Sequence, residues 1–148
     1  MGDQENMEKE SASFSPRIVA FCCDRSAYQA ADLAGEMHLV FPEGLDIIRV
    51  PCTGRVDLVY LLRALEDGAD GVAVLACFED NCKYISGNIR ARKRVEYARK
   101  LLKELGLEEE RIVIFNLASN MPHRFVELVQ AMAEEIRKLG PSPLRAKQ

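Results

Sequence analysis

The chain has 148 residues, of which 48% are hydrophobic and 29% are charged, and its formal net charge is −3. This composition is typical of a globular protein, and the length suits a single domain with its own core. The negative charge argues against a dedicated nucleic-acid binder. We expect a cytoplasmic protein without a membrane span, because no apolar run approaches the roughly 20 residues that cross a bilayer and the N-terminus does not resemble a signal peptide.

The chain order predicts one domain between two flexible tails. Residues 1–16 are rich in Glu, Ser, Gln and Asn and can bury little surface, and residues 141–148 are similar. Between them, over residues 17–140, short apolar runs alternate with longer amphipathic stretches, as in consecutive βα units. The predicted strands are Arg17–Cys23, Asp46–Cys52, Gly71–Cys77 and Arg111–Leu117.

These strands are nearly continuous in apolar residues, as expected of parallel strands that helices cover on both faces. The predicted fold class is therefore α/β: a single three-layer domain with a four-stranded parallel sheet, flavodoxin-like or Rossmann-like in strand order. A capping box formed by Ser26 and Gln29 is expected to begin the first helix. The predicted helices run from Ser26 to about Gly35, from Val56 to Asp67, from Arg90 to Leu105, and from near Asn120 to Gly140.

Cysteines mark the ends of the first three predicted strands. Cys22 and Cys23 end the first strand, Cys52 the second and Cys77 the third, and Cys82 follows in the next loop. Disulfides are not expected in a reducing compartment. Because the carboxyl ends of parallel strands form one edge of the sheet, where such folds bind ligands, the sequence predicts that these thiols meet there.

An all-thiolate set favours zinc or an iron–sulfur cluster. Structural zinc sites usually take their cysteines in pairs two to four residues apart, whereas the spacing of Cys77 and Cys82 is more typical of two-iron clusters. An anionic cluster also needs positive charge nearby, and Arg55 and Lys83 lie in the connecting segments. The basic run Arg90–Arg94 is either a docking or charge-balancing feature of this site or a solvated face.

A thiol-based redox enzyme or cysteine nucleophile is the rival from another class, since a thiol at a helix N-terminus is reactive. Cys52 precedes Gly54 and Arg55, but phosphatase-type chemistry needs a longer anion-binding loop. A cysteine hydrolase needs a positioned histidine. His38, in a polar turn, and His123, in the first turn of the last helix, are both expected at the surface.

Two ordered motifs carry a resemblance to a known family. They are Cys52-x-Gly54-Arg55-Val56-Asp57 and Cys77-x4-Cys82-x-Tyr84-x-x-Gly87-Asn88, after an opening stretch from Phe21 to Gly35. With these motifs, the region from about Arg17 to Gly140 resembles the delta subunit of methyl-viologen-reducing hydrogenase. The resemblance implies a small subunit with a 2Fe-2S cluster that does not itself catalyse the chemical step. It implies electron relay between a hydrogenase or formate dehydrogenase and a heterodisulfide reductase, with the reductase's flavin subunit as docking partner.

The chain departs from the family pattern at two places. The family typically carries C-x-x-C at the first strand end, where this chain has Cys23 followed by Ser26, and it often has histidines where this chain has Phe78 and Lys83. Four family-type cysteines remain, which is the number that a two-iron cluster requires. The expected ligands are Cys23, Cys52, Cys77 and Cys82, with Cys22 and Ser26 in reserve and Arg55 and Lys83 near the cluster. Zinc in a structural module stays the alternative.

Overall fold

The computed structural model describes residues 14–78 and 87–145 of the chain. The elements in chain order are β1 (Ile18–Cys23), α2 (Ala27–Glu36), β2 (Leu45–Val50), η1 (Thr53–Arg55), α3 (Leu58–Glu66), β3 (Gly71–Ala76), α4 (Gly87–Glu104), η3 (Glu109–Arg111), β4 (Ile112–Asn116) and α5 (Pro122–Leu139). All four predicted strands and all four predicted helices are present, with bounds that differ by a few residues. The two short 3₁₀ helices, η1 and η3, were not predicted.

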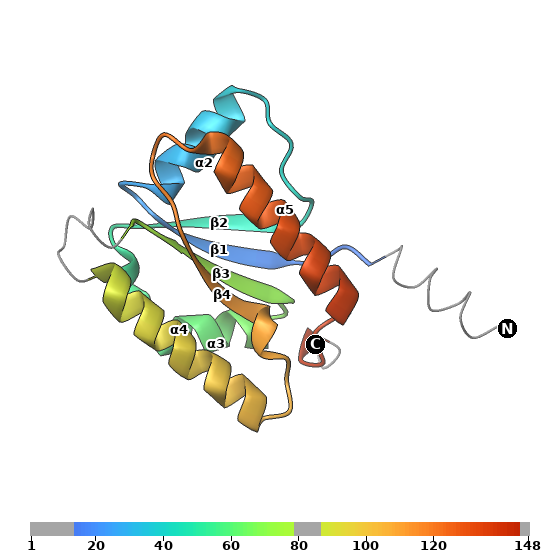
Figure 1. Ribbon diagram of the computed structural model, residues 1–148. Helices are drawn as coiled ribbons and strands as arrows, with labels where there is room; N and C mark the ends of the chain where they lie inside the picture. The colour runs from blue at the N-terminus through green and yellow to red at the C-terminus, as the bar shows by residue number, and fades with distance from the viewer. Residues whose placement is uncertain (1–13, 79–86, 146–148) are drawn as a thin grey trace, which may run out of the picture.

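The four strands form one parallel sheet in the order β2-β1-β3-β4. Helices α2 and α5 cover one face, and α3 and α4 cover the other (Figure 1). This three-layer arrangement with flavodoxin-like strand order confirms the predicted fold class. Because every strand runs in the same direction, β2, β1 and β3 end side by side at one edge of the sheet.

Alternate side chains of β1 pack into two separate cores, one on each face of the sheet. Ala20 and Cys22 belong to the core beneath α2 and α5, whereas Phe21 belongs to the core beneath α3 and α4. The central strand β3 is buried over its whole length, as a parallel strand covered on both faces should be. No helix in residues 14–78 and 87–145 is both long and apolar enough to cross a membrane.

Two helix starts differ from the prediction. Ser26 does occupy the N-cap position of α2, but its side chain makes no capping hydrogen bond, so the predicted capping box is wrong. Its backbone (φ −137°, ψ −85°) departs from the extended conformation that aims an N-cap oxygen at the first turn. The second predicted helix begins at Leu58 rather than Val56, because Asp57 is extended and its carboxylate caps Leu58 N–H at 2.7 Å.

The segment after α5 packs against the domain over residues 141–145. Ser142 is 1% exposed, and its backbone N–H donates to the buried Asp70 carboxylate at 2.9 Å. The Arg145 side chain forms an ion pair with the same carboxylate at 2.8 Å. Composition predicts a flexible tail over residues 141–148. In the structure, Ser142 and Arg145 of this segment both bind Asp70, which lies 72 and 75 positions earlier in the sequence.

Candidate metal centre at the carboxyl edge of the sheet

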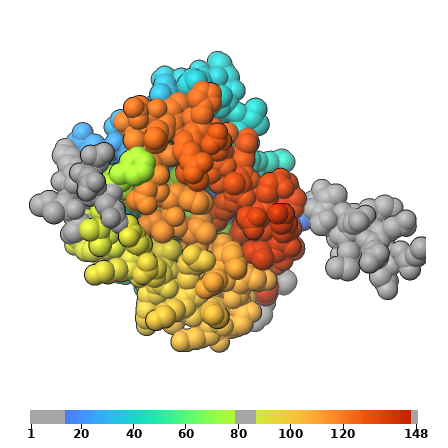
Figure 2. Space-filling model, viewed as in Figure 1, coloured from blue at the N-terminus to red at the C-terminus, as the bar shows by residue number. Residues whose placement is uncertain are grey.

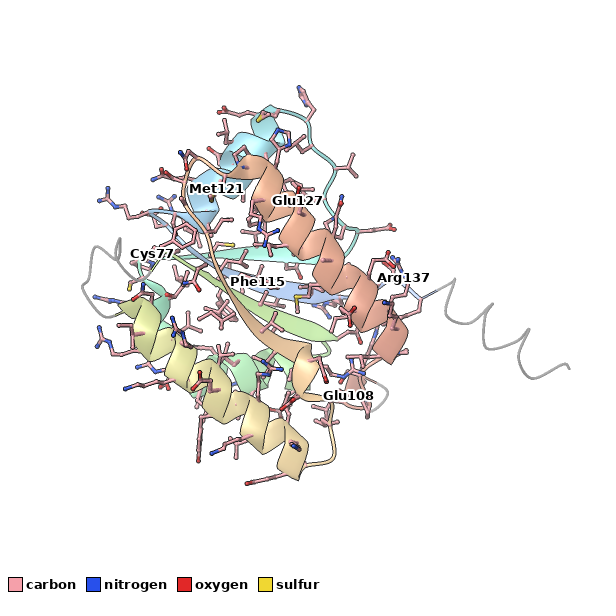
Figure 3. All side chains as sticks on the ribbon, viewed as in Figure 1. Cys77, Glu108, Phe115, Met121, Glu127 and Arg137 are labelled. Atoms are coloured by element: carbon pink, nitrogen blue, oxygen red, sulfur yellow. The ribbon has the colours of Figure 1, made fainter. Side chains whose placement is uncertain are left out.

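Three of the predicted ligands lie at the carboxyl ends of adjacent strands. Cys23 is the last residue of β1, Cys77 follows the last residue of β3, and Cys52 lies two residues beyond β2. All three side chains are buried, with at most 6% exposure. Figure 3 labels Cys77 where β3 ends, on the side of the molecule where α4 begins. We call this edge, with Cys23, Cys52 and Cys77, the carboxyl rim. The other predicted residues, Cys82 and Lys83, lie outside the described residues.

The turn after β2 directs Cys52 inward from the edge strand. Helix η1 contacts β1, β3 and α4, so the chain crosses beneath the neighbouring strand ends instead of leaving the sheet. At the contact with α4, a Cβ on Gly54 would lie 2.6 Å from Gly87 Cα, which no side chain tolerates. The glycines of the two motifs therefore permit one close backbone approach. This approach brings the Cys52 turn against the first residue of α4.

The Cys52 sulfur lies in a local backbone turn. Its Sγ accepts a hydrogen bond from the Gly54 N–H at 3.4 Å, and its carbonyl accepts one from the Arg55 N–H at 3.0 Å. An N–H donor favours a thiolate over a thiol, and donors to the ligand sulfurs tune iron–sulfur clusters. The Arg55 side chain is exposed and lines an open apolar groove of about 690 Å³ with Val50 and Val56. The Cys52 turn thus offers a backbone donor to the sulfur.

Two asparagine amides hold the backbone at Cys77. Asn88 Nδ2 donates to the carbonyls of Cys77 at 3.2 Å and Phe78 at 2.9 Å, and Asn116 Nδ2 donates to the Cys77 carbonyl at 2.8 Å. Asn88 is 1% exposed. The side chain of Asn88 therefore ties the first turn of α4 to the end of β3, where the segment that carries Cys82 begins.

The basic run Arg90–Arg94 is divided between two environments. Arg90 and Lys93 are exposed, as expected of a solvated face. Arg94 is half-buried, and its Nη1 donates to the Gly54 carbonyl and, at 3.1 Å, to the Val56 carbonyl. The last arginine of the run therefore binds the turn that follows Cys52, a role that the sequence pattern did not indicate.

Cys22 occupies a different environment from Cys23. Its side chain is fully buried in the core beneath α2 and α5. Burial, and secondarily the neighbouring Cys23, raises the pKa of Cys22 to about 12. A metal ligand must be a thiolate, and removing the proton from this buried thiol costs more than it does at an ordinary cysteine. The alternation predicted for the pair is therefore present, and Cys22 has the properties of a core residue.

Two buried hydroxyls at the carboxyl rim have no hydrogen-bond partner among the described residues: Ser26 Oγ and Thr53 Oγ1. Thr53 directly follows Cys52, and Ser26 lies three residues after Cys23. A buried donor without an acceptor is costly, so its partner is expected among the residues outside the described ones, in a bound water or in a bound group. Sulfur acceptors of an anionic cluster would satisfy both hydroxyls. The donor set of soft thiols, hydroxyls and backbone N–H groups fits a thiolate-ligated cluster.

The described part of the chain does not complete a metal site by itself. Within residues 14–78 and 87–145, no three His, Cys, Asp or Glu side chains are grouped so as to hold a metal ion. The fourth predicted ligand, Cys82, lies outside these residues. Both histidines are exposed to solvent: His38 follows α2, and His123 lies in the first turn of α5.

Comparison with known proteins agrees with the motifs. Residues 18–140 match the family model described as methyl-viologen-reducing hydrogenase, delta subunit. The chain is 44% identical over 131 residues to the vhu iron-sulfur subunit of the F420-non-reducing hydrogenase of Methanocaldococcus jannaschii, covering 88% of this chain and 98% of that protein. The corresponding hydrogenase subunit of Methanopyrus kandleri is 44% identical over 124 residues, which are 84% of this chain and 94% of that one.

A third relative is much longer than this chain. It is a subunit of the ferredoxin/F420H2-dependent CoB-CoM heterodisulfide reductase of Methanosarcina acetivorans, 36% identical over 133 residues that cover 90% of this chain but 17% of that protein. The family-model match spans most of the chain, and the hydrogenase subunits align over nearly their whole length. The chain therefore belongs to the methyl-viologen-reducing hydrogenase delta subunit family.

Proposed function

We propose that this chain is an electron-transfer subunit that holds one 2Fe-2S cluster on the thiolates of Cys23, Cys52, Cys77 and Cys82. The observation that carries the proposal is the burial of three cysteines on three adjacent strand ends, beside two buried hydroxyls without acceptors in the described residues. Such thiols, delivered from separate segments to one edge, suit a shared inorganic centre more than three independent packing roles.

When bound, the cluster supplies one-electron oxidation and reduction. The residues of the chain bind it and set its environment. The Gly54 N–H already points at Cys52 Sγ, and the hydroxyls of Ser26 and Thr53 are the proposed further donors. Hydrogen bonds to sulfur stabilise the reduced, more negative state and so raise the reduction potential. Arg55 and, outside the described residues, Lys83 are the proposed cations near the site.

The proposed partners are a hydrogenase or formate dehydrogenase on one side and the flavin subunit of a heterodisulfide reductase on the other. Relatives that align over nearly their whole length are named hydrogenase iron-sulfur subunits. A stretch similar to this chain also makes up 17% of a heterodisulfide reductase polypeptide. A domain found both as a hydrogenase subunit and within a reductase polypeptide suits a relay between the two enzymes.

Metal analysis of anaerobically purified protein tests the cluster. The expected result is about two irons and two acid-labile sulfides per chain, a brown colour, and an electron paramagnetic resonance signal after reduction. Colourless protein with one zinc per chain would replace the proposal with a structural zinc module. Metal-free protein with one reactive thiol and turnover would replace it with the thiol enzyme.

Single cysteine variants test the ligand set. Serine at Cys23, Cys52, Cys77 or Cys82 is expected to reduce iron content severely, while Cys22→Ala is the matched control and keeps the cluster. Retention of wild-type iron in any of the first four variants would remove that residue from the set. Loss of iron in folded Cys22→Ala would identify Cys22 as a ligand.

Substitutions of Ser26 test the departure from the family's C-x-x-C pattern. Ser26→Ala removes the buried hydroxyl that has no acceptor in the described residues. If this hydroxyl only donates to a cluster sulfur, the variant keeps its iron and its reduction potential falls. Complete loss of iron from folded Ser26→Ala would instead identify the serine oxygen as a ligand.

Electron transfer tests the partners. Reduced holoprotein is expected to pass electrons to a purified heterodisulfide reductase flavin subunit, followed as flavin reduction in a stopped-flow spectrometer. Apoprotein and Cys52→Ser provide the controls. A loaded cluster that reduces no such flavin would preserve the cofactor proposal and refute the proposed acceptor.

A further inference from the structure

We propose that Asn88 and Arg94 are positioning residues, through which the first half of α4 holds the Cys77 strand end and the Cys52 turn in place before a metal binds. The inference deepens the proposed function, because it concerns two of the same thiols. It rests on the hydrogen bonds that these two side chains donate to backbone carbonyls of the two segments.

The Cys77 carbonyl lies just beyond the regular sheet. The pairing of β3 with β4 ends at Ala76 and Asn116, so the next residue needs other partners to stay aligned. Asn116, the last residue of β4, supplies one amide donor, and Asn88 supplies the other. The Cys77 carbonyl therefore receives donors from both the neighbouring strand and α4, which fixes the backbone at the point where Cys77 leaves the sheet.

The Cys52 turn is held in an equivalent manner by a guanidinium. Arg94 donates to the carbonyls of Gly54 and Val56, on both sides of Arg55. The backbone contact between Gly54 and Gly87 brings the same helix against the same turn. A charged donor binds carbonyls more strongly than a neutral one and spans the turn with one rigid group. Arg94 therefore limits movement of a segment that has left the edge strand β2.

Both positioning residues come from one rigid element. Asn88 is in the first turn of α4 and Arg94 is about two turns later, so the helix fixes the distance between them. The strand end and the turn are otherwise separate pieces of chain that could move independently. Holding both on one helix presents the two thiols at a constant separation, which lowers the conformational cost of binding a shared centre.

Site-resolved thiol labelling of metal-free, full-length protein tests this directly. Under anaerobic reducing conditions, iodoacetamide labelling of each cysteine is followed by mass spectrometry. Arg94→Ala is expected to raise the labelling rate of Cys52 about tenfold while the rate at Cys77 stays near wild type. Asn88→Ala is expected to do the reverse. Cys22, fully buried in the core, reports global opening.

Three matched variants separate positioning from general destabilisation. Lys93→Ala removes an exposed cation one residue away and is expected to change no rate. Arg94→Lys keeps a charged donor and is expected to restore much of the protection of Cys52. If Asn88→Ala does not fold, Asn88→Ser removes the same amide donor from α4 while keeping a short polar side chain, and tests the same expectation. Labelling of Cys52 and Cys77 that rises only in parallel with Cys22 would overturn the inference.

The loaded protein gives a second readout. Arg94→Ala is expected to shift the reduction potential or the resonance spectrum of the cluster, which Lys93→Ala leaves unchanged. The proposed function and the positioning roles can be refuted independently of each other. Wild-type protein that binds no iron refutes the proposed function, whereas wild-type labelling patterns in both Arg94→Ala and Asn88→Ala refute the positioning roles whether or not iron binds.

Discussion

At the amino edge of the sheet, the buried Asp70 carboxylate accepts hydrogen bonds from the backbone of Arg17 and Ser142 and from the Arg145 side chain. At the carboxyl rim, by contrast, the buried hydroxyls of Ser26 and Thr53 have no partner in the described part of the chain. Both edges bury polar groups. Among the described residues, the Asp70 carboxylate has its hydrogen-bond partners within the domain, whereas the two rim hydroxyls do not.

Arg111 shows how extensive the amino-edge network is. Its side chain is 1% exposed and donates to Glu108, to the Asp70 carbonyl and to the Gly140 carbonyl. Figure 3 labels Glu108 on the side of the molecule away from Cys77. In the space-filling view, α4 (yellow) and α5 (red) lie on either side of the orange segment that contains β4 (Figure 2). The two edges therefore differ in one respect: protein groups satisfy the buried polar atoms of the amino-edge network, whereas the described residues supply no acceptor for the two rim hydroxyls.

The largest effect on stability is expected from Arg111→Met. Methionine keeps much of the volume but leaves the buried carbonyls of Asp70 and Gly140 without this donor, so the free energy of unfolding should fall by about 3 kcal/mol. Urea unfolding of the apoprotein measures it. Arg137→Met is the control, since that arginine forms an exposed pair with Glu134 and should change stability by less than about 0.5 kcal/mol.

The iron content of Arg111→Met tests whether the two edges of the sheet act independently. Because Arg111 lies at the edge away from the cysteines, folded Arg111→Met should bind as much iron per chain as wild type. A variant that stayed folded but lost its iron would show that the two edges are not independent, and the distinction between a structural network and the proposed ligand site would fail.

The same contrast explains what the sequence could predict. Strands, helices and the placement of three thiols at one edge follow from local periodicity and from the geometry of parallel sheets. The opposite facing of Cys22 and Cys23 follows from strand alternation, and Cys22 does lie in the core beneath α2 and α5. These features depend on residues that are close in sequence or on the common direction of the strands.

The contacts that fix the two edges join residues far apart in sequence. Arg111 begins a strand in the pattern, and its burial depends on carbonyls 29 and 41 positions away. Asn88 belongs to the second family motif, but its role depends on the end of β3, and in the sequence Arg94 is one more cation of a basic run. Amphipathic periodicity does not encode which carbonyl a polar side chain will reach, so these roles required the structure.

An effect of intermediate size on stability is expected from replacing Cys22. This residue directly precedes the rim residue Cys23 in the sequence, but its side chain packs in the core beneath α2 and α5. Its pKa is raised to about 12 in the folded chain, so its contribution to stability is full below the unfolded pKa near 9 and is lost as the pH rises toward 12. At pH 10.5, ionisation in the unfolded state should already cost wild type about 2 kcal/mol relative to pH 7.5.

Apoprotein with Cys22→Ala should lack this part of the alkaline loss. The measurement is urea unfolding of both proteins at pH 7.5 and pH 10.5, because the lysines, the tyrosines and the thiols other than the coupled neighbour Cys23 titrate alike in the two proteins and cancel in the difference. If wild type and Cys22→Ala lost the same stability between the two pH values, Cys22 would not be the buried neutral thiol of the core, and its exclusion from the rim would lose its support.

The smallest effect is expected from Glu108→Gln, at the solvent side of the amino-edge network. The hydrogen bond from Arg111 lowers the pKa of Glu108, so the pair stabilises the fold above the ordinary carboxyl pKa and loses this contribution as the pH falls through the folded value. Because Glu108 is 38% exposed, solvent screens the pair, and the substitution should cost less than about 1 kcal/mol at pH 7 and a smaller amount at pH 3, where more of the carboxyl is protonated. Urea unfolding at both pH values measures it, with exposed Glu110→Gln as control. A loss at pH 7 as large as that of Arg111→Met would mean that the arginine stabilises the fold through its charge partner, whereas the structure assigns most of its effect to the carbonyls it holds.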